Sequence, residues 1–432
     1  MKRFTFRELK NAVAIVAGAL RDQGVRRGDR VIIYMPMIPE TVQAMLACAR
    51  IGAIHSVVFG GFAANELAAR IDDATPKLIM TASCGIEVQR VIPYKPLLDE
   101  AIELASHKPQ KTLLCQRSQC EALMTHSGRD VDWDDAIAAA SPVDCVAVEA
   151  TDPLYILYTS GTTGEPKGVV RDNGGHAVAL AWSMNNVYDV SPGAIFWAAS
   201  DVGWVVGHSY IVYAPLLAGC TTIAYEGALD HPGPETVWQL IEELGVTGVF
   251  TSPTAVRLLM RYGEAASRKH DLSSLERVFC AGEVLNAPVW EWLQKVVLED
   301  RIPVIDHMWQ TETGGPIFGN PYGLEMVPIK PGSSGIPLPG IEAAVMTPQG
   351  EPCGPGDKGV MVIKRPFPGL TPTLWGEPDR YRTDYWERLP NVYYTGDSAH
   401  IDEDGYVWFA GRADEIIKIA AHRLGTIEVE TA

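Results

Sequence analysis

The chain has 432 residues, 47% of them hydrophobic, and a formal net charge of −17. This length predicts two or three structural units with a large core. Because the sequence has neither an apolar run of the ~18–20 residues that span a membrane nor a basic stripe, it argues against a membrane or nucleic-acid partner.

The cysteines and the first residues favour a cytoplasmic protein. The eight cysteines lie far apart, mostly in apolar runs. The one close pair, Cys115 and Cys120, has no second pair or nearby histidine to complete a zinc site. We therefore interpret all eight as reduced thiols. The first six residues lack the apolar stretch and the cleavage site of a secretion signal.

The first part of the chain alternates helices and strands. Thr5 and Glu8 have the spacing of a capping box, and Gly24 is placed to end the helix that follows. Further elements are predicted as strands at 31–35, 54–59 and 77–81 and as helices at 39–50 and 63–73. This alternation predicts a mostly parallel sheet that is covered on both faces. We interpret the less regular, more polar stretch 106–151 as a surface connection.

The alternation resumes after residue 151 and indicates a second α/β unit. Strands are predicted at 154–158, 195–200, 222–225, 246–251, 277–281 and 304–308, and helices between them, for example at 208–217 and 234–244.

From about residue 314 to 410, Gly and Pro become frequent and the strands are short. They are predicted at 342–346, 359–364 and 406–409, with Asp404-Gly405 as a hairpin turn. We therefore expect a small β-barrel-like unit or a distorted sheet. The expected organisation is one large domain, 1–410, with α/β units at about 1–150 and 151–315 and a β-rich unit at about 316–410, followed by a new segment at 411–432.

The most informative stretch runs from Tyr158 to Gly168 and reads YTSGTTGEPKG. Its glycines let the backbone approach a ligand closely, and its hydroxyls, amides and Lys167 suit a polyphosphate. It is not a Walker A loop, because Lys167 is followed by Gly168 and the strand-like Val169-Val170. This disfavours a P-loop NTPase. An ordinary surface turn would not be expected to combine hydroxyls, glycines, proline and lysine in this order.

This string resembles the signature of the adenylate-forming (AMP-binding) superfamily, which includes acyl-CoA synthetases, peptide-synthetase adenylation domains and luciferases. The segments 34–39, 199–210, 309–314 and 421–426 further resemble acetyl-CoA and propionyl-CoA synthetases, and the propionyl-CoA branch most. The resemblance implies an α/β fold with two stacked α/β sheet units and a smaller β-barrel-like unit. It also implies ATP or AMP, Mg²⁺ and coenzyme A as ligands, and no obligate protein partner.

By this resemblance, two carboxylates hold the metal and the ribose. Glu312 is implied to be the Mg²⁺ ligand, in keeping with the preference of magnesium for oxygen. Asp397 is implied to accept hydrogen bonds from both ribose hydroxyls, as an ionised carboxylate can. Outside this context, Glu312 would be interpreted as a structural carboxylate and the Thr-Gly-Asp motif around Asp397 as an ordinary turn.

The remaining implied roles are as follows. Catalytic roles fall on Thr159, Lys167, Glu312 and Arg423. Contacts to ATP or AMP fall on Thr159, Ser160, Gly161, Thr162, Thr163, Gly164, Lys167, Gly282, Glu283, Val284, Asp306, His307, Met308, Trp309, Gln310, Thr311, Asp397, Arg412 and Arg423. Two positions depart from the family pattern, since Val284 replaces a proline and Met308 replaces an aromatic residue.

Trp309 is implied to form the floor of the acyl pocket, which should exclude long fatty acids. Trp204, Val205, Val206 and Ala281 are implied to complete the pocket. Relatives that activate acetate tend to have Val where Ala281 stands, so Ala281 should leave room for about one more carbon. Because a methylene is worth only ~1–3 kcal/mol of discrimination, we expect propionate over acetate, with overlap, and other acids of this size. Without the resemblance these residues would be interpreted as core packing.

The last residues are expected to contain a hinge at Asp414, where a short polar residue can absorb the rotation of a small C-terminal domain. The family's catalytic lysine lies in that domain, beyond residue 432, so we expect a trimmed or naturally truncated form with weak adenylation and little thioester formation. The positions that match CoA contacts are Arg90, Ala420 and Ala421.

The sequence therefore predicts a cytoplasmic ligase that activates a short carboxylic acid with ATP to acyl-AMP and then to acyl-CoA. Two alternatives stay open. One is an acetate-preferring enzyme of the same kind. The other is a non-catalytic adenylate-binding remnant that lacks the domain with the catalytic lysine.

Overall fold

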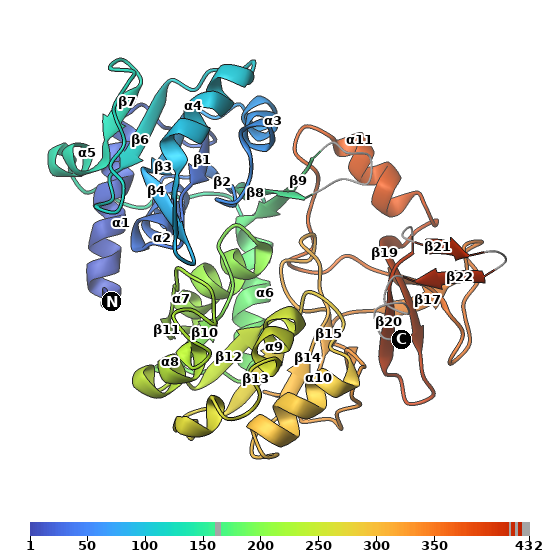
Figure 1. Cartoon of the computed structure of the whole chain (residues 1–432). Helices are drawn as coiled ribbons and strands as arrows, with labels where there is room; N and C mark the ends of the chain where they lie inside the picture. Colours follow the sequence, from blue (N-terminus) through green and yellow to red (C-terminus); the bar gives the residue numbers. More distant parts are fainter. Residues whose placement is uncertain (160–165, 414–415, 420–421, 426–432) are drawn as a thin grey trace.

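This computed structural model describes residues 1–159, 166–413, 416–419 and 422–425, with side chains described as far as Ala413. Three sheets dominate the described chain (Figure 1). The first is surrounded by the N-terminal helices, the second follows in green to yellow, and the third lies beside them in orange and red. Among the described residues, no helix combines the length and apolar character that crossing a bilayer requires.

The first sheet has seven strands in the order β7-β6-β3-β1-β2-β8-β9, parallel except for the β8–β9 pair. Its strands are β1 (Arg30–Tyr34), β2 (Ile54–Val57), β3 (Leu78–Ala82), β6 (Lys111–Cys115), β7 (Asp130–Asp132), β8 (Pro153–Thr159) and β9 (Lys167–Asp172). The accompanying helices are α1 (Phe6–Asp22), α2 (Pro39–Arg50), α3 (Ala64–Ala74), α4 (Tyr94–Leu104) and α5 (Trp133–Ala139), and a hairpin is formed by β4 (Cys84–Glu87) and β5 (Arg90–Pro93).

The start of α1 confirms the predicted capping box. The Thr5 side chain accepts a hydrogen bond from the Glu8 amide, and the Glu8 carboxylate accepts one from the Thr5 amide at 2.7 Å. These reciprocal bonds satisfy amides that a helix N-terminus leaves without intrahelical partners.

Two expectations for this region are wrong. The stretch 106–151 is not only a surface connection, because it supplies β6 and β7 to the sheet as well as α5. The strand predicted at 154–158 belongs to the first sheet, where β8 lies beside β2, so the second sheet does not begin at residue 151. The physical reason is that strands of three to five residues carry little periodicity, and that sheet membership depends on non-local pairing.

The second sheet is parallel throughout, with the order β11-β10-β12-β13-β14. Its strands are β10 (Ile195–Ala198), β11 (Thr221–Thr222), β12 (Gly248–Thr251), β13 (Arg277–Cys280) and β14 (Val304–Asp306). The helices around it are α6 (Asn173–Asn186), η1 (Gly207–Tyr213), α7 (Ala214–Ala218), α8 (Thr236–Leu244), α9 (Pro253–Met260), η2 (Ser267–Lys269), α10 (Ala287–Glu291) and η3 (Trp292–Val297). One core cluster joins Val31 and Ile33 of β1 to Phe250 of β12 and Phe279 of β13, so the two sheets pack on shared apolar residues.

The third sheet is antiparallel, with the order β17-β18-β19-β20. Its strands are β17 (Ala343–Met346), β18 (Gly359–Ile363), β19 (Tyr393–Ile401) and β20 (Val407–Arg412), and the same region contains β15 (Phe318–Gly319), β16 (Ile336–Pro337), α11 (Pro378–Tyr381), η4 (Arg382–Trp386), β21 (Ile416–Ile419) and β22 (His422–Gly425). Of the two forms expected here, the distorted sheet is observed, with register shifts on both sides of β19. The predicted turn at Asp404-Gly405 joins β19 to β20.

Candidate active site

A cavity of about 790 Å³ opens where the segments that follow β13 and β14 face β19 and β20. Ligand sites of parallel α/β sheets commonly lie at the carboxyl ends of the strands, and this volume is typical of a small-molecule site. The predicted nucleotide residues that line the cavity are Gly282, Glu283, Val284, His307, Met308, Trp309, Gln310, Asp397 and Arg412, and the predicted metal ligand Glu312 lines it as well.

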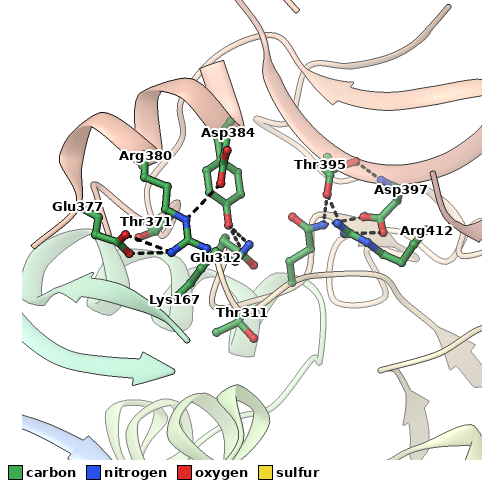
Figure 2. Close-up of polar contacts among 12 residues, drawn as sticks. Lys167, Thr311, Glu312, Thr371, Glu377, Arg380, Asp384, Thr395, Asp397 and Arg412 are labelled. Carbon is green, nitrogen blue, oxygen red and sulfur yellow. Dashed lines mark hydrogen bonds and ion pairs between the residues drawn. The ribbon is translucent and has the colours of Figure 1, made fainter. Parts of the chain in front are cut away.

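Asp397 lies at the centre of a polar group on one side of the cavity (Figure 2). Its Oδ2 accepts a hydrogen bond from Gln310 Nε2 at 2.6 Å, and its Oδ1 lies 3.3 Å from Arg412 Nη1. Asp397 and Arg412 are register partners across the β19–β20 pair. The antiparallel register therefore brings together two residues that lie fifteen positions apart in the chain.

Gly396 makes this arrangement possible. Its φ is +77°, and a Cβ at this position would lie 2.4 Å from the Arg412 guanidinium. Glycine is therefore needed both for the left-handed backbone and for the space that Arg412 occupies. This assigns a structural reason to the glycine of the Thr-Gly-Asp motif.

Burial raises the pKa of Asp397 from its ordinary value to about 6. Arg412 opposes this rise by stabilising the ionised form, whereas the nearby negative charge of Glu312 adds to it. The carboxylate is thus ionised at neutral pH, although its ionisation is less favourable than in water. Such a buried carboxylate gains from any ligand that donates hydrogen bonds to it.

Lys167, Tyr385 and Glu312 form a second polar group (Figure 2 labels Lys167 and Glu312). Lys167 Nζ donates to the Tyr385 hydroxyl at 2.9 Å, and this hydroxyl donates to Glu312 Oε1 at 2.5 Å. The pKa of Tyr385 is raised by burial and then by the Glu312 charge, so its hydroxyl stays protonated at neutral pH. The sequence analysis missed Tyr385, and no local motif marks it.

Arg171 of β9 is fully buried and holds the segment that contains Glu312. Its guanidinium donates to the carbonyls of Thr311 at 2.5 Å, Glu312 at 3.1 Å and Gly369. A Cβ on Gly314, whose φ is +67°, would lie 2.8 Å from Arg171 Cζ. The backbone at 311–314 therefore wraps around this cation. The analysis of the sequence missed Arg171, although a charged residue within the strand pattern was a visible signal.

The apolar residues predicted for the acyl pocket lie in three places. Trp309 and Val206 pack against the core cluster that contains Ala281, and Trp309 also lines the cavity. Val205 packs against a separate cluster around Leu154. Trp204 is half exposed and lines a second cavity of about 460 Å³. Three of the five residues thus belong to one large apolar cluster, and of the five only Trp309 lines the first cavity.

Several other predicted residues lie next to the cavity or away from it. Asp306 is buried and accepts a hydrogen bond from Ser334, which lines the cavity. Thr159 has a buried Oγ1 without a partner in the described part of the chain. Arg90 is exposed and pairs with Glu87 at 2.6 Å. The predicted residues that lie outside the described ones are Ser160, Gly161, Thr162, Thr163, Gly164, Asp414, Ala420 and Ala421, and the side chain of Arg423 also lies outside them.

Besides Asn286 and Ser334, two residues of one helix that the sequence analysis did not consider also line the cavity. Thr254 donates from its amide to Glu283 Oε1 at 2.7 Å, and Arg257 pairs with the same carboxylate. Both belong to α9, so this helix holds the Glu283 side chain at the cavity wall.

Glu312 presents a carboxylate at the cavity wall. Magnesium is typically bound by one or two protein carboxylates, with phosphate oxygens and waters completing its shell. Among the described residues, no group of three or more His, Cys, Asp or Glu side chains could hold a metal ion by itself. A single carboxylate at the cavity is a donor of the kind that a magnesium ion bound to phosphates can use.

Comparisons with known proteins identify the family. The sequence model of the family described as AMP-binding enzyme matches residues 1–375. The chain is 49% identical over 436 residues to the propionate–CoA ligase of Escherichia coli K12, covering 99% of this chain and 68% of the ligase. It is 45% identical over 435 residues to the acetyl-coenzyme A synthetase of Pyrobaculum aerophilum, covering 100% of this chain and 65% of the synthetase.

A third relative is the mitochondrial acyl-CoA synthetase short-chain family member 3 of Pongo abelii, 45% identical over 433 residues, with 99% of this chain and 62% of the relative covered. The chain thus spans 62–68% of the length of these three relatives.

Proposed function

This chain belongs to the AMP-binding enzyme family, and we propose that it activates a short carboxylic acid, with propionate preferred, by forming acyl-AMP from ATP on the way to acyl-CoA. The observation that carries the proposal is the position of Trp309. This residue packs on the apolar core that contains Ala281 and also lines the cavity with Gln310 and Glu312. An apolar acid and a charged nucleotide would therefore meet at one short segment.

In the first step, an oxygen of the acid attacks the α-phosphorus of ATP, a new P–O bond forms, and pyrophosphate leaves. Both reactants are anions, so the site must position them and neutralise charge. Lys167 would contribute a positive charge beside the phosphates, and Glu312 would hold a magnesium ion that neutralises phosphate charge. The loop 160–164 and Arg423 are proposed to contact the phosphates as well.

Asp397 would hold the ribose by accepting hydrogen bonds from its two hydroxyls. Arg412 supports this role because it stabilises the ionised carboxylate at 3.3 Å, and Gln310 fixes the other oxygen at 2.6 Å. The adenine is proposed to lie against residues 282–284 and 306–308, most of which line the same cavity.

In the second step, the thiol of CoA attacks the acyl carbon, a thioester forms, and AMP leaves. The proposed CoA contacts are Arg90, Ala420 and Ala421, and the proposed hinge for the change between the two steps is Asp414. The names of relatives that act on CoA support this step.

Selectivity for a short acid would come from Trp309, Val206 and Ala281. The indole packs edge-on against Tyr210, with ring centroids 5.5 Å apart, and also contacts Phe250. This packing supports a closed floor. Acetate is the second candidate substrate, because similar relatives are named for acetate as well as for propionate.

We also propose a cytoplasmic location, which the eight unpaired cysteines support.

The test is calorimetric binding of AMP esters as mimics of the acyl-adenylate, with ethyl, propyl, butyl and octyl groups. We expect the tightest binding for the propyl or butyl ester and none for the octyl ester. Tightest binding of the ethyl ester would favour acetate. Tight binding of the octyl ester would contradict the assignment of Trp309 as a floor, and a chain that binds no ester would contradict the proposed nucleotide site.

A further inference from the structure

Tyr385 stands between the two charged residues that the proposed function places at the phosphates. Its hydroxyl accepts from Lys167 Nζ at 2.9 Å and donates to Glu312 Oε1 at 2.5 Å, whereas Lys167 Nζ and Glu312 Oε1 are 3.9 Å apart. A direct charge-assisted N–H···O bond would be about 2.7–2.9 Å long. The hydroxyl thus occupies the place where Lys167 and Glu312 would otherwise meet.

We propose that Tyr385 is a positioning residue that keeps the 3.9 Å ion pair of Lys167 and Glu312 from closing into a direct hydrogen-bonded pair, so that each stays available to the triphosphate and its metal. The inference rests on the proposed function. Lys167 and Glu312 are only 16% and 12% exposed, so solvent screens their attraction weakly and a direct pair would be hard to open.

The packing around Tyr385 fixes the hydroxyl in this place. The residue is buried in η4, and its ring stacks on Tyr393 with centroids 5.4 Å apart and an interplanar angle of 11°. The ring of Tyr381 also lies close, with its centroid 5.4 Å from that of the Tyr385 ring. Lys167 Nζ further lies 5.1 Å from the centre of the Tyr385 ring, so ring and hydroxyl both contact the cation.

The substitution that tests this role is Tyr385→Phe, which keeps the ring and removes only the hydroxyl. The matched control is Tyr381→Phe, because the Tyr381 hydroxyl donates to the Thr371 carbonyl at 2.6 Å rather than to Lys167 or Glu312. Two ligands are titrated calorimetrically into the full chain. One is a non-hydrolysable ATP analogue with Mg²⁺, and the other is the propyl ester of AMP, which has no β- or γ-phosphate.

We expect Tyr385→Phe to weaken binding of the Mg²⁺–ATP analogue by about tenfold and to leave binding of the ester unchanged, since breaking one charge-assisted contact is an effect of this size. Tyr381→Phe should change neither affinity. A Tyr385→Phe chain that binds both ligands like the wild type would overturn the inference. Equal weakening for both ligands would overturn it too, because that result indicates general damage to the site.

A double substitution distinguishes two explanations for weaker binding in Tyr385→Phe. One is closure of the direct pair between Lys167 and Glu312, and the other is the loss of the hydroxyl as a contact of its own. If Tyr385 acts by preventing the ion pair, adding Tyr385→Phe to Glu312→Gln should cause no further loss of affinity for the Mg²⁺–ATP analogue, because the neutral amide cannot form that pair. Additive losses would contradict the inference. A wild-type chain that binds neither the analogue nor the ester would instead contradict the proposed function itself.

Discussion

The Asp397→Asn substitution should raise stability and weaken binding at the same time. Asparagine has nearly the same shape as aspartate but carries no charge, so it removes the unfavourable burial of the carboxylate. A rise of the pKa from 3.8 to about 6 corresponds to about 3 kcal/mol of unfolding free energy. The side chain is only 13% exposed, so solvent screening should reduce this figure little.

The sign of the pH dependence follows from the raised pKa. Between about pH 4 and pH 6 the native chain holds a proton on Asp397 that the unfolded chain has released. This contribution to stability is therefore fully present below about pH 4 and is lost as the pH rises through about 6. The asparagine variant has no carboxyl group at this position to titrate, so its stability does not fall in this pH range. Its unfolding free energy should equal that of the wild type near pH 4 and exceed it by about 1–3 kcal/mol at pH 7.

Binding should change in the opposite direction. Two ribose hydroxyls that donate to a carboxylate form charge-assisted hydrogen bonds. Losing these bonds should weaken binding of the propyl ester of AMP by about 10- to 100-fold at pH 7. Wild-type affinity should also fall as Asp397 is protonated below about pH 6, whereas the affinity of the variant should not.

The assays are urea unfolding at pH 4 to 7 and calorimetry with the ester. Asp402→Asn, in the turn that joins β19 to β20, is the matched control. Despite partial burial, hydrogen bonds from Lys330, the Tyr406 amide and Trp408 lower the pKa of Asp402 to about 2. Replacing this stabilised carboxylate by an amide should therefore lower the unfolding free energy at pH 7. An Asp397→Asn chain that is less stable at pH 7, or that binds the ester as tightly as the wild type, would refute the reasoning.

Three further substitutions test separate parts of the structure. Ala281→Val should move the preferred AMP ester from propyl to ethyl, with ~1–3 kcal/mol of discrimination, and an unchanged preference would contradict the pocket assignment. Gly314→Ala should lower the unfolding free energy by about 1–3 kcal/mol in urea, because its Cβ would lie 2.8 Å from Arg171 Cζ at a positive φ. Thr5→Ala should cost about 1 kcal/mol in the same assay, because it removes the cap that binds the Glu8 amide.

The parts that could be predicted from the sequence are those with a local signal. The first helix was visible in its capping box, and the turn between β19 and β20 in Asp404-Gly405. The cavity residues 282–284, 307–310 and 312 were named from the family resemblance and not from a local pattern. The structure places them directly after β13 and β14, where parallel strands bring their carboxyl ends to one edge.

The contacts that could not be predicted join distant segments. Lys167 meets Tyr385 across 218 positions of the chain, and Arg171 meets Thr311 across 140. No spacing rule links residues so far apart, because their meeting depends on the packing of the first sheet against the C-terminal region. Strand β19 was missed as well, since its bulges interrupt the alternation of side chains on which such predictions depend.

The segment 309–312 explains why acid and nucleotide sites should be coupled. Trp309 packs into the apolar core, Gln310 bonds to Asp397 of β19, and Glu312 bonds to Tyr385 of η4. The backbone between these side chains is held by Arg171, and the Glu312 carbonyl also accepts from the Thr371 amide at 2.7 Å. A shift of this backbone would therefore move the proposed acyl floor, the proposed ribose contact and the proposed metal ligand together. In-line transfer tolerates only small errors in the distance between carboxylate and α-phosphorus, so a single rigid segment that carries all three is a direct way to keep that distance constant.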